Sequence, residues 1–259
     1  MTISIITATY NSGTTVRDTF ESVLSQIFKN IEYIVIDGGS TDDTLKIIRE
    51  YELRFEGRMR WISERDRGLY DAMNKGIAMD PGDVVGFLTL DDFYTAPDVL
   101  TSVAATLENK TIDAVYGDIH FVRPDNLSRC VRYYSSNIFR PWLMRLGFIP
   151  AHPSFYCRKS LYNRYGTFNI DYKIAADVEI LLRLIYVHRI QAKYLKKDFV
   201  TMRMGGISTN GMASHRLIMR DQLRALRDNG VYSNAAILSL RYIYTICELF
   251  NSKLKYFFI

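Results

Sequence analysis

The chain is poor in cysteine and has no long hydrophobic run. Its three cysteines, Cys130, Cys157 and Cys247, are scattered without metal-binding spacing, which argues against a disulfide framework and favours a reducing compartment. No apolar run reaches the roughly 18 residues that a membrane-spanning helix needs. The first residues already follow a strand pattern, so we expect no signal peptide. Together these absences predict a cytoplasmic protein.

The sequence also lacks internal repeats, low-complexity segments and a linker that would divide it into independent domains. Its 259 residues suffice for one large α/β domain, and 48% hydrophobic with 24% charged residues is ordinary for a globular protein. The net charge of +5, from 33 basic and 28 acidic residues, is modest. It suits a phosphate-bearing partner such as a nucleotide sugar, an anionic membrane or a nucleic acid, or it has no specific meaning.

The opening segment has the pattern of a β-α-β unit. Apolar runs over residues 3–7 and 34–37 each end in small and polar residues. Between them, apolar residues recur at helical spacing: Val16, Phe20, Val23, Leu24 and Ile27. Parallel strands place their carboxyl ends along one rim, where open α/β sheets bind ligands. The residues expected on this rim, where they could hold a nucleotide base, are Thr7, Ala8, Tyr10, Asn11 and Asp37.

Strand and helix patterns continue to alternate along the chain. Strands are expected over residues 58–63, 84–88, 112–119 and 199–204, and a short helix over residues 68–78. The alternation predicts an α/β fold. By expected function the chain divides near residue 120. Residues 1–120 form the nucleotide-sugar half, and residues 121–209 form the acceptor half. Residues 210–259 form a predicted C-terminal helical extension.

Two motifs in the first forty-four residues resemble those of the family 2 glycosyltransferases, inverting enzymes that use nucleotide-diphospho-sugars. The family patterns are T-x-Y-N and D-[DG]-[GS]-S-x-D-x-T; in the corresponding places this chain has Thr7-Ala8-Thr9-Tyr10-Asn11 and the run from Asp37 to Thr44. The resemblance implies the GT-A fold, a Rossmann-like, mostly parallel sheet flanked by helices. It also implies that the loop after the first strand and Asp37 clasp the base, usually uracil. An aromatic side chain such as Tyr10 can stack on a base, although residues 40–43 also read as an ordinary helix cap and first turn.

Residues 63–76 resemble a S-E-x-D-x-G-x-Y-D-A-M-N-K-G block in bacterial family 2 enzymes that build surface polysaccharides. Asp66 and Gly68 would let the backbone approach a ligand, and Arg67 would supply positive charge near the nucleotide. A charged loop followed by a capped helix would explain Asp66 and Asp71 without any ligand.

The metal site is expected after the fourth strand, where Asp91 and Asp92 follow a buried apolar run. Adjacent carboxylates there are costly unless a cation or hydrogen bonds satisfy them. A hard divalent ion, Mg²⁺ or Mn²⁺, is the natural partner, bridging a carboxylate and the donor's two phosphates. By resemblance Asp92 binds the metal at an exposed rim position, and Asp91 lies near the ribose or the metal's waters. Thr89 stands where many members carry Asp or Asn; the alternative for Asp92 is a helix cap before residues 93–98.

An inverting transfer needs a base that deprotonates the acceptor hydroxyl. Asp177 matches the family's A-x-D-x-x-[LF]-x-x-R block, whose aspartate is the expected base. It lies at the start of a helical stripe, where the helix end should hold its pKa down. Glu179 is the second choice, because it can pair with Arg183 on a solvated helix face. A plain helix cap is the alternative for Asp177.

Two patches belong to the acceptor half. His152 lies in a stretch that resembles the family's H-[PQ]-[SA] strand and could hydrogen-bond the acceptor or the diphosphate; a structural role is equally compatible. Residues 205–208 resemble the family's G-G-[IV]-S loop, which could form an anion-binding nest or a plain turn. With Arg203 and His215 near it in sequence, we expect this loop to close on the pyrophosphate.

The C-terminal segment, residues 234–259, has an amphipathic pattern. Its apolar positions recur every three or four residues: Ile237, Leu240, Tyr244, Cys247, Phe250, Leu254 and Phe257. Basic residues lie among them, so the segment could associate peripherally with the inner face of the cell membrane. The alternatives are packing on the body of the protein or on a second copy in a homodimer.

The sequence therefore predicts a metal-dependent, inverting hexosyltransferase. It would move a sugar from a UDP-sugar to a hydroxyl of a lipid-diphosphate-linked saccharide in polysaccharide or O-antigen synthesis. A nucleotidyltransferase acting on sugar phosphates should carry a glycine-rich, basic loop after the first strand, and residues 7–13 have no basic residue. A nucleic-acid-binding module should cluster its basic residues with aromatics; here they are spread, so we expect no nucleic acid partner.

Overall fold

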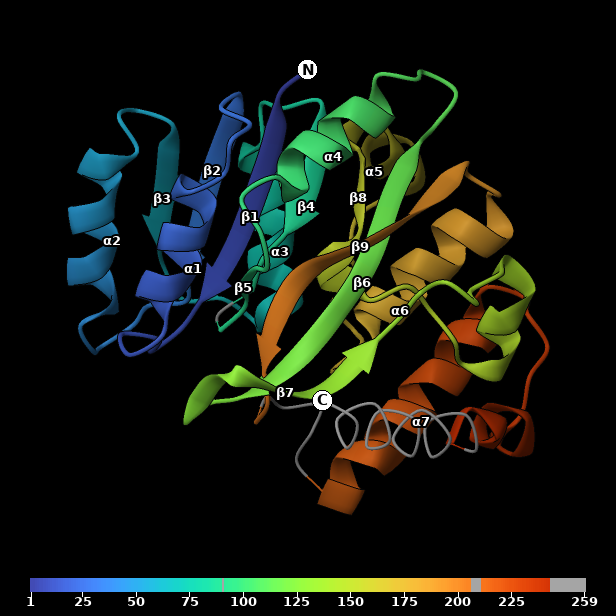
Figure 1. Ribbon diagram of the computed structural model, residues 1–259. Coiled ribbons are helices and arrows are strands. Elements are labelled where there is room, and N and C mark those ends of the chain that lie inside the picture. Colours follow the sequence, from blue (N-terminus) through green and yellow to red (C-terminus); the bar gives the residue numbers. More distant parts are fainter. Residues whose placement is uncertain (90, 206–210, 243–259) are drawn as a thin grey trace, which may run out of the picture.

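The computed structural model describes residues 1–89, 91–205 and 211–242 of the chain. In this part, nine strands form one curled sheet in the order β3-β2-β1-β4-β8-β6-β9-β5, with β7 paired to β6 (Figure 1). The strands are β1 Ile3–Thr9, β2 Ile31–Asp37, β3 Met59–Ser63, β4 Val84–Phe87, β5 Phe93–Tyr94, β6 Ala114–Arg123, β7 Asn126–Tyr134, β8 Tyr156–Arg158 and β9 Ala192–Arg203. The helices are α1 Val16–Leu24, α2 Thr44–Arg54, α3 Leu69–Met79, α4 Val99–Leu107, α5 Lys159–Tyr165, α6 Ala176–Leu181 and α7 Gly211–Asp228. Short 3₁₀ turns η1 Pro141–Leu146 and η2 His152–Ser154 and the π-helical turn η3 Leu182–Val187 complete the elements.

The first half of the sheet is parallel throughout. β1 pairs with β2 and β4, and β2 pairs with β3. Their register places Thr9 opposite Asp37 and Asp37 opposite Ser63, so the carboxyl ends of β1, β2 and β3 align. Antiparallel β8 then joins β4 to β6, which continues the sheet into the second half. The predicted α/β class is therefore confirmed, and one sheet contains strands of both halves.

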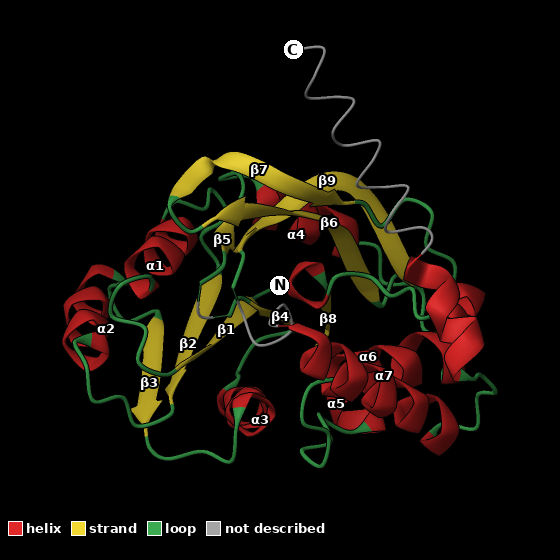
Figure 2. Ribbon diagram, turned by 90° about the horizontal axis from the view of Figure 1, so that it is seen from below, coloured by secondary structure: helices red, strands yellow, loops and turns green. Residues whose placement is uncertain are grey.

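Two hydrophobic cores lie on the two faces of the sheet. On one face, alternate residues of β1 pack with α1, α2 and α4 around Phe20, Tyr33 and Ile48. On the other face, Ile6 and Ala8 pack with α3, α5, α6 and α7, which lie together on one side of the sheet in Figure 2. The alternation of buried side chains along β1 follows from the two-residue period of a strand. Every strand of the parallel half is therefore fixed on both sides.

Three local predictions were wrong. The helix after the first strand ends at Leu24, and Ile27 is 60% exposed instead of joining its apolar stripe. Strand β1 extends to Thr9, two residues beyond the expected end. The segment after Asp92 forms the short strand β5, and α4 begins only at Val99. Asp92 is therefore not the cap of a helix over residues 93–98.

The described part of the C-terminal segment packs on the body of the protein. Residues 235–242 are helical, Leu238 is fully buried, and the Arg241 guanidinium donates to Gln222 Oε1 at 2.5 Å. Residues 243–259, which carry most of the predicted apolar stripe, lie outside the described residues. Membrane association and dimerisation through this segment stay predictions. Within residues 1–89, 91–205 and 211–242, no helix is both long and apolar enough to cross a bilayer.

Close packing at Gly86 gives a test of the sheet. A Cβ at Gly86 would lie 2.1 Å from Cε1 of Tyr156, a fully buried ring whose hydroxyl bonds to Tyr94. Gly86→Ala should therefore lower the free energy of unfolding by about 1–3 kcal/mol, measured by urea denaturation. Because Tyr156→Leu would make room, the double variant should lose less than the sum of the two single losses. Wild-type stability in Gly86→Ala would contradict this contact.

Candidate active site

The carboxyl ends of β1, β2, β3 and β4, with the loops that follow them, form the rim where the sequence places the site. Hydrogen bonds tie these ends together: the Gly38 amide donates to Thr9 O at 2.8 Å, and the Leu88 amide donates to Ile6 O at 3.0 Å. The rim is therefore built from backbone that the sheet holds rigidly. It brings together the loops at residues 10–13, 38–43, 64–68 and 88–92.

Asp37 is fully buried at the end of β2. Its Oδ2 accepts from the amides of Gly39 at 3.1 Å and Ser40 at 2.9 Å and from the Ser63 hydroxyl at 2.6 Å. The Ser40 hydroxyl donates to Oδ1 at 2.5 Å. These four bonds shape the loop after β2, so they favour the structural alternative for Asp37; its contact with a base stays a prediction.

Asn11 joins the first two loops of the rim. Its backbone has φ 49°, in the left-handed region that asparagine tolerates better than most residues. Its amide donates to the Ser40 hydroxyl at 2.8 Å, and its side-chain Oδ1 accepts from the Thr41 amide at 2.9 Å. The asparagine of the T-x-Y-N motif therefore fixes the two loops relative to each other. Tyr10, the aromatic residue of the motif, is also exposed.

Tyr10 and Asp66 both lie against Gly38. A Cβ at Gly38 would lie 2.7 Å from Asp66 Oδ2 and 3.4 Å from Tyr10 Cδ2, so only glycine allows this approach without a shift. Tyr10 is 57% exposed. Asp66 accepts from the Gly68 amide through Oδ1 at 2.8 Å, and its Oδ2 has no hydrogen-bond partner among the described residues. An aromatic face and a carboxylate oxygen therefore meet at one point of the rim.

Thr7 and Ala8 lie elsewhere than predicted. Both are buried inside β1, because the strand runs on to Thr9. The Thr7 hydroxyl donates to Leu88 O at 2.7 Å and lies 2.9 Å from the Tyr33 hydroxyl. Its hydrogen-bonding capacity is used inside the protein, so the placement of Thr7 and Ala8 on the exposed rim was wrong.

Asp91 and Asp92 lie in the loop after β4, as predicted, but Asp92 is not exposed. Only 3% of it is accessible, and Thr89 donates to its Oδ2 at 2.9 Å. Burial, opposed by the Thr89 bond and reinforced by the Asp91 charge, raises the pKa of Asp92 to about 7. Asp91 is half-buried, and its Oδ1 accepts from the Thr15 hydroxyl at 2.7 Å. The expectation of a freely exposed Asp92 was therefore wrong.

Arg203, at the end of β9, closes this loop from the acceptor half. Its guanidinium donates to the Asp91 carbonyl at 2.6 Å, pairs with Asp18 and stacks over Phe93 at 5.1 Å. Only 6% of its side chain is accessible, so Arg203 holds the Asp91–Asp92 loop. The following residues 206–210, which contain most of the predicted pyrophosphate loop, lie outside the described residues, as does the side chain of His215.

The carboxylate pair has the chemistry of a divalent-cation site. No group of three or more His, Cys, Asp or Glu side chains could hold a metal in the part of the chain that the structure describes. Mg²⁺ is commonly bound by one or two carboxylates with the remaining ligands from water and substrate phosphates. A buried carboxylate whose pKa is raised gains from a nearby cation, which favours its ionised form. The residues present therefore fit a metal that the donor diphosphate helps to hold.

Asp177 lies in the first turn of α6 and is half-buried. The Tyr70 hydroxyl, on the first turn of α3, donates to its Oδ1 at 3.2 Å. Burial raises the pKa of Asp177 to about 6. Hydrogen bonds from the Val178 amide and the Tyr70 hydroxyl lower this pKa, but their effect is smaller than that of burial. The expectation that the helix end holds this pKa down was wrong, since desolvation outweighs it. A carboxylate with a pKa near neutrality is better matched to general-base work.

Glu179 is not on a solvated helix face. It is 6% exposed and forms two 3.0 Å bonds with Arg183, while Asn229 donates to its Oε1 at 3.2 Å. The predicted pairing with Arg183 is confirmed, but it is buried between α6 and the end of α7. Glu179 is therefore occupied in packing, which leaves Asp177 as the candidate base on this helix.

His152 and Arg67 take contrasting positions. His152 is buried in η2 and stacks on Phe87 at 5.2 Å, and burial lowers its pKa to about 4, so the ring is neutral at pH 7. Arg67 is exposed, and its backbone amide and guanidinium both donate to Asp71 at 3.0 Å. The donor or acceptor contacts predicted for both residues stay predictions.

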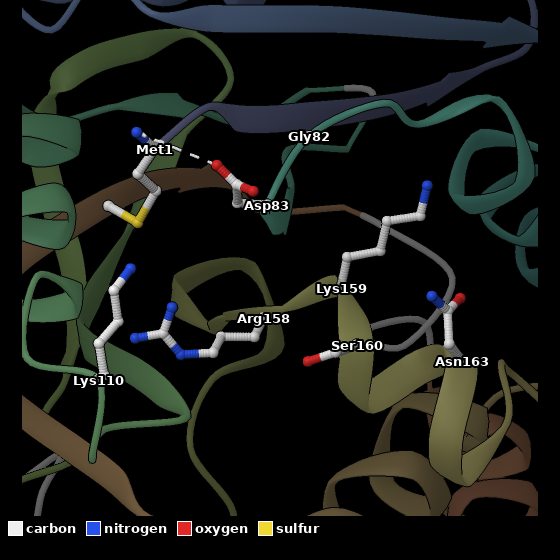
Figure 3. A pocket seen from close by; sticks show the side chains of 8 residues that line it. All are labelled: Met1, Gly82, Asp83, Lys110, Arg158, Lys159, Ser160 and Asn163. Atoms are coloured by element: carbon white, nitrogen blue, oxygen red, sulfur yellow. Dashed lines mark ion pairs between the residues drawn. The ribbon is translucent and has the colours of Figure 1, made fainter.

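A pocket of about 400 Å³ lies at the opposite, amino end of β1 and β4 (Figure 3). Two of its three basic side chains are already used: Arg158 donates to the carbonyls of Leu107 and Ile112, and Lys159 donates to the Asp80 carbonyl. Asp83 pairs with the terminal amine of Met1 at 4.0 Å. None of the predicted site residues lines it, so this pocket is separate from the candidate active site.

The sheet and its flanking helices have the GT-A fold, as comparison with solved structures shows. TarS of S. aureus in complex with UDP-GlcNAc matches with a TM-score of 0.66 at 20% identity, over 92% of this chain and 71% of that one. The mannosyltransferase PcManGT of Pyrobaculum calidifontis, in complex with GDP-Man and Mn²⁺, matches with a TM-score of 0.61 at 15% identity, over 95% and 80% of the two chains. At these identities the likeness shows the fold.

Sequence comparison gives the family. The model of glycosyl transferase family 2 matches residues 4–165. An uncharacterised glycosyltransferase of Mycobacterium tuberculosis is 34% identical over 218 residues, which are 83% of this chain and 78% of the relative. This chain therefore belongs to glycosyl transferase family 2. The match covers the rim loops and His152, whereas Asp177 lies beyond the matched residues.

Proposed function

We propose that this protein transfers a sugar, with inversion, from a UDP-sugar to a hydroxyl of a saccharide acceptor. One observation carries the proposal: Asp177, a half-buried carboxylate with a pKa of about 6, lies beside the first turn of α3, directly after the loop of Asp66. With Asp177 as the base, proton abstraction would take place next to the rim that carries the Tyr10–Asp66 cluster. Acceptor deprotonation and donor binding would then occur at adjoining surfaces.

The Tyr10–Gly38–Asp66 cluster would hold the base of the donor. A uracil stacked on the exposed Tyr10 ring would cover Gly38, with Asp66 Oδ2 at its edge to accept the imide N–H. Asp37 would act beneath it, by fixing the loop on which the base rests. The UDP-GlcNAc in the TarS structure supports a uridine donor, whereas the GDP-Man in PcManGT makes guanosine the competing choice.

Asp91 and Asp92 would hold Mg²⁺ or Mn²⁺ together with the donor diphosphate. When bound, the cation supplies a Lewis acid that stabilises the charge of the leaving nucleoside diphosphate. The protein's own contribution is orientation, since the Asp91 carboxylate is bonded by Thr15 and its carbonyl by Arg203. The Mn²⁺ in the PcManGT complex supports divalent metal use.

Asp177 would accept the proton of the acceptor hydroxyl as that oxygen attacks the anomeric carbon. A single displacement from the face opposite the leaving diphosphate turns an α-linked donor into a β-linked product. A pKa of about 6 keeps most of the carboxylate ionised at pH 7 while retaining basicity. A lipid-diphosphate-linked saccharide at an inner membrane surface is the proposed acceptor, which rests on the resemblance to surface-polysaccharide enzymes.

A nucleotide panel tests the donor assignment. At about 100 times its dissociation constant, a ligand stabilises the fold by about 2.7 kcal/mol. This corresponds to a rise in Tm of roughly 5–10 °C for a protein of this size. We expect UDP with Mn²⁺ to give such a rise, UDP with EDTA a much smaller one, and GDP or CDP with Mn²⁺ little. Larger stabilisation by GDP would overturn the uridine assignment, and stabilisation only by nucleoside triphosphates would favour a nucleotidyltransferase.

A further inference from the structure

Helix α3 and the loop before it carry the longest sequence motif of the chain, and the proposed function gives a ligand-binding role only to Asp66 of it. Its polar residues close the loop at residues 64–68: Asp71 accepts from the Arg67 amide, and Lys75 donates to the Arg65 carbonyl at 3.2 Å and pairs with Glu64 at 2.8 Å. Three other residues of the helix, Tyr70, Asn74 and Gly76, point to different neighbours. These neighbours are Asp177, Phe168 and Ile6 respectively.

Gly76 fixes the helix to the strand that begins the rim. A Cβ at this position would lie 2.4 Å from Cγ2 of Ile6, which is fully buried in the middle of β1. Glycine therefore lets the helix backbone approach β1 more closely than any other residue would allow. This packing fixes the position of α3 relative to β1. It therefore also fixes α3 relative to the loop after β1, which carries Tyr10.

Asn74 fixes the same helix to the acceptor half. Its side-chain amide donates to the Phe168 carbonyl at 2.8 Å and accepts from the Phe168 amide at 2.9 Å. The Phe168 ring packs edge-on against Phe87 of β4 and His152 of η2, with centroids 5.3 and 5.4 Å apart. A two-bond clamp of this kind sets both the position and the rotation of the backbone at residue 168.

Tyr70, one helical turn before Asn74, reaches the segment that carries the base. Its ring is buried and stacks on Phe168 at 5.7 Å. Its single hydroxyl proton is shared between two acceptors, the Ile174 carbonyl and Asp177 Oδ1, the latter at 3.2 Å. Burial and the Asp177 charge raise the pKa of Tyr70 well above its ordinary value, so the hydroxyl stays protonated and remains a donor.

The segment before α6 is also held from its other side. Asp221 of α7 is buried, and its Oδ2 accepts from the amides of Lys173 at 3.1 Å and Ile174 at 3.2 Å. Ile174 is thus bonded through its amide to α7 and through its carbonyl to α3. Of these two supports, only Tyr70 also contacts the carboxylate of Asp177.

We propose that Tyr70 is a positioning residue for Asp177, and that α3 sets the place of the base relative to the nucleotide-binding strands. Close packing at Gly76 fixes the helix against β1, and the two Asn74 hydrogen bonds fix the acceptor half against the helix. The Tyr70 hydroxyl orients the carboxylate. This inference rests on the proposed role of Asp177 as the general base. It assigns to the Y-D-A-M-N-K-G part of the motif a role in coupling the two halves, in place of donor binding.

The effect of Tyr70 on the pKa of Asp177 can be measured from the pH dependence of activity. The ionisable groups on the elements around Asp177 include Tyr70 on α3, His152 on η2, Asp221, Arg224 and Asp228 on α7, and the Glu179–Arg183 pair of α6 and η3. His152 is neutral above its pKa of about 4. The Tyr70 hydroxyl bonds the ionised form of Asp177, so it lowers that pKa. Removing it should raise the pKa of the base.

Tyr70→Phe is the test, with Tyr172→Phe as the matched control. Tyr172 is also buried and lies in the same segment, but its hydroxyl bonds to Asp228 at 2.9 Å and not to Asp177. We expect Tyr70→Phe to lower kcat on the order of 10-fold with little change in donor KM. The acid limb of its pH–kcat profile should move to higher pH, because activity requires the ionised base. Tyr172→Phe should keep the wild-type limb, and thermal melts would confirm that both variants fold.

The outcomes separate this inference from the proposed function. A wild-type pH profile and kcat in Tyr70→Phe, while Asp177→Asn is inactive, would overturn the positioning role and leave the base assignment in place. Full activity in Asp177→Asn would overturn the proposed function itself. An equal shift of the limb in Tyr70→Phe and Tyr172→Phe would also overturn the inference, since it would indicate a general loosening of the segment.

Discussion

Replacing Asp177 with asparagine should lower kcat by roughly 10²–10⁴-fold, the usual contribution of a general base. The amide has the size of the carboxylate and can still accept the Tyr70 hydroxyl bond, so the fold should be kept. It cannot take the acceptor's proton. Affinity for UDP should stay within a few-fold, because Asp177 acts on the acceptor. Steady-state kinetics with a donor-hydrolysis or transfer assay, together with UDP titration, would measure both quantities.

Glu179→Gln is the control from the same helix. Glu179 is bonded to Arg183 and Asn229 inside the protein, so this change should lower stability while kcat per folded molecule falls far less. Retained kcat in Asp177→Asn together with a lost kcat in Glu179→Gln would give the role of base to Glu179. If both variants stayed active, the base would have to be sought elsewhere in the acceptor half.

The parallel half of the fold could be predicted because its signals are local. The apolar runs that became β1 and β2 are short, end in polar residues and enclose a helical stripe, so their pairing follows from the β-α-β rule. The rim loops follow in turn, since Tyr10, Asp66 and Asp91 each lie in the loop that follows a strand. Strand ends were less well predicted: Thr7 and Ala8 looked terminal, but the register of β1 against Asp37 extends the strand to Thr9.

The ionisation of the site could not be predicted, because it depends on contacts between distant residues. Asp177 follows a helix start, which alone would lower its pKa. Its burial comes from α3, which lies about a hundred positions earlier in the sequence, and desolvation outweighs the helix end. Asp92 likewise looks like an exposed loop residue until the parts of the chain that enclose it are in place. The spacing of residues within a motif does not show whether distant parts of the chain will bury them.

The role of Tyr70 was hidden for a related reason. Its motif is continuous in sequence and lies between two donor-side strands, and the predicted donor contacts, at Asp66, Arg67 and Gly68, left Tyr70 without a role. The hydroxyl of Tyr70 instead crosses to a residue 107 positions away. A motif can thus be long because several of its residues meet different neighbours, here β1, Phe168 and Asp177. The arrangement becomes visible only when those neighbours are placed.

Asp92→Asn should reduce transfer by roughly 10²-fold or more, through loss of a cation ligand at the leaving diphosphate. The change should disturb the fold little. An amide oxygen can accept the Thr89 hydroxyl bond, and a carboxylate with a pKa of about 7 is already partly neutral at neutral pH. The free energy of unfolding should therefore change by about 1 kcal/mol or less. Urea denaturation and steady-state kinetics would measure the two effects separately.

A manganese titration shows whether this loss arises from the metal. In the wild type, activity and the UDP-induced rise in Tm should both increase with Mn²⁺ and then saturate. In Asp92→Asn the saturation point should move to higher Mn²⁺, because one carboxylate ligand is missing from a site that has few. Asp83→Asn, an exposed carboxylate at the amino end of the sheet, should titrate like the wild type. An unchanged Mn²⁺ dependence and turnover in Asp92→Asn would remove Asp92 from the metal site and leave Asp91 as its only carboxylate.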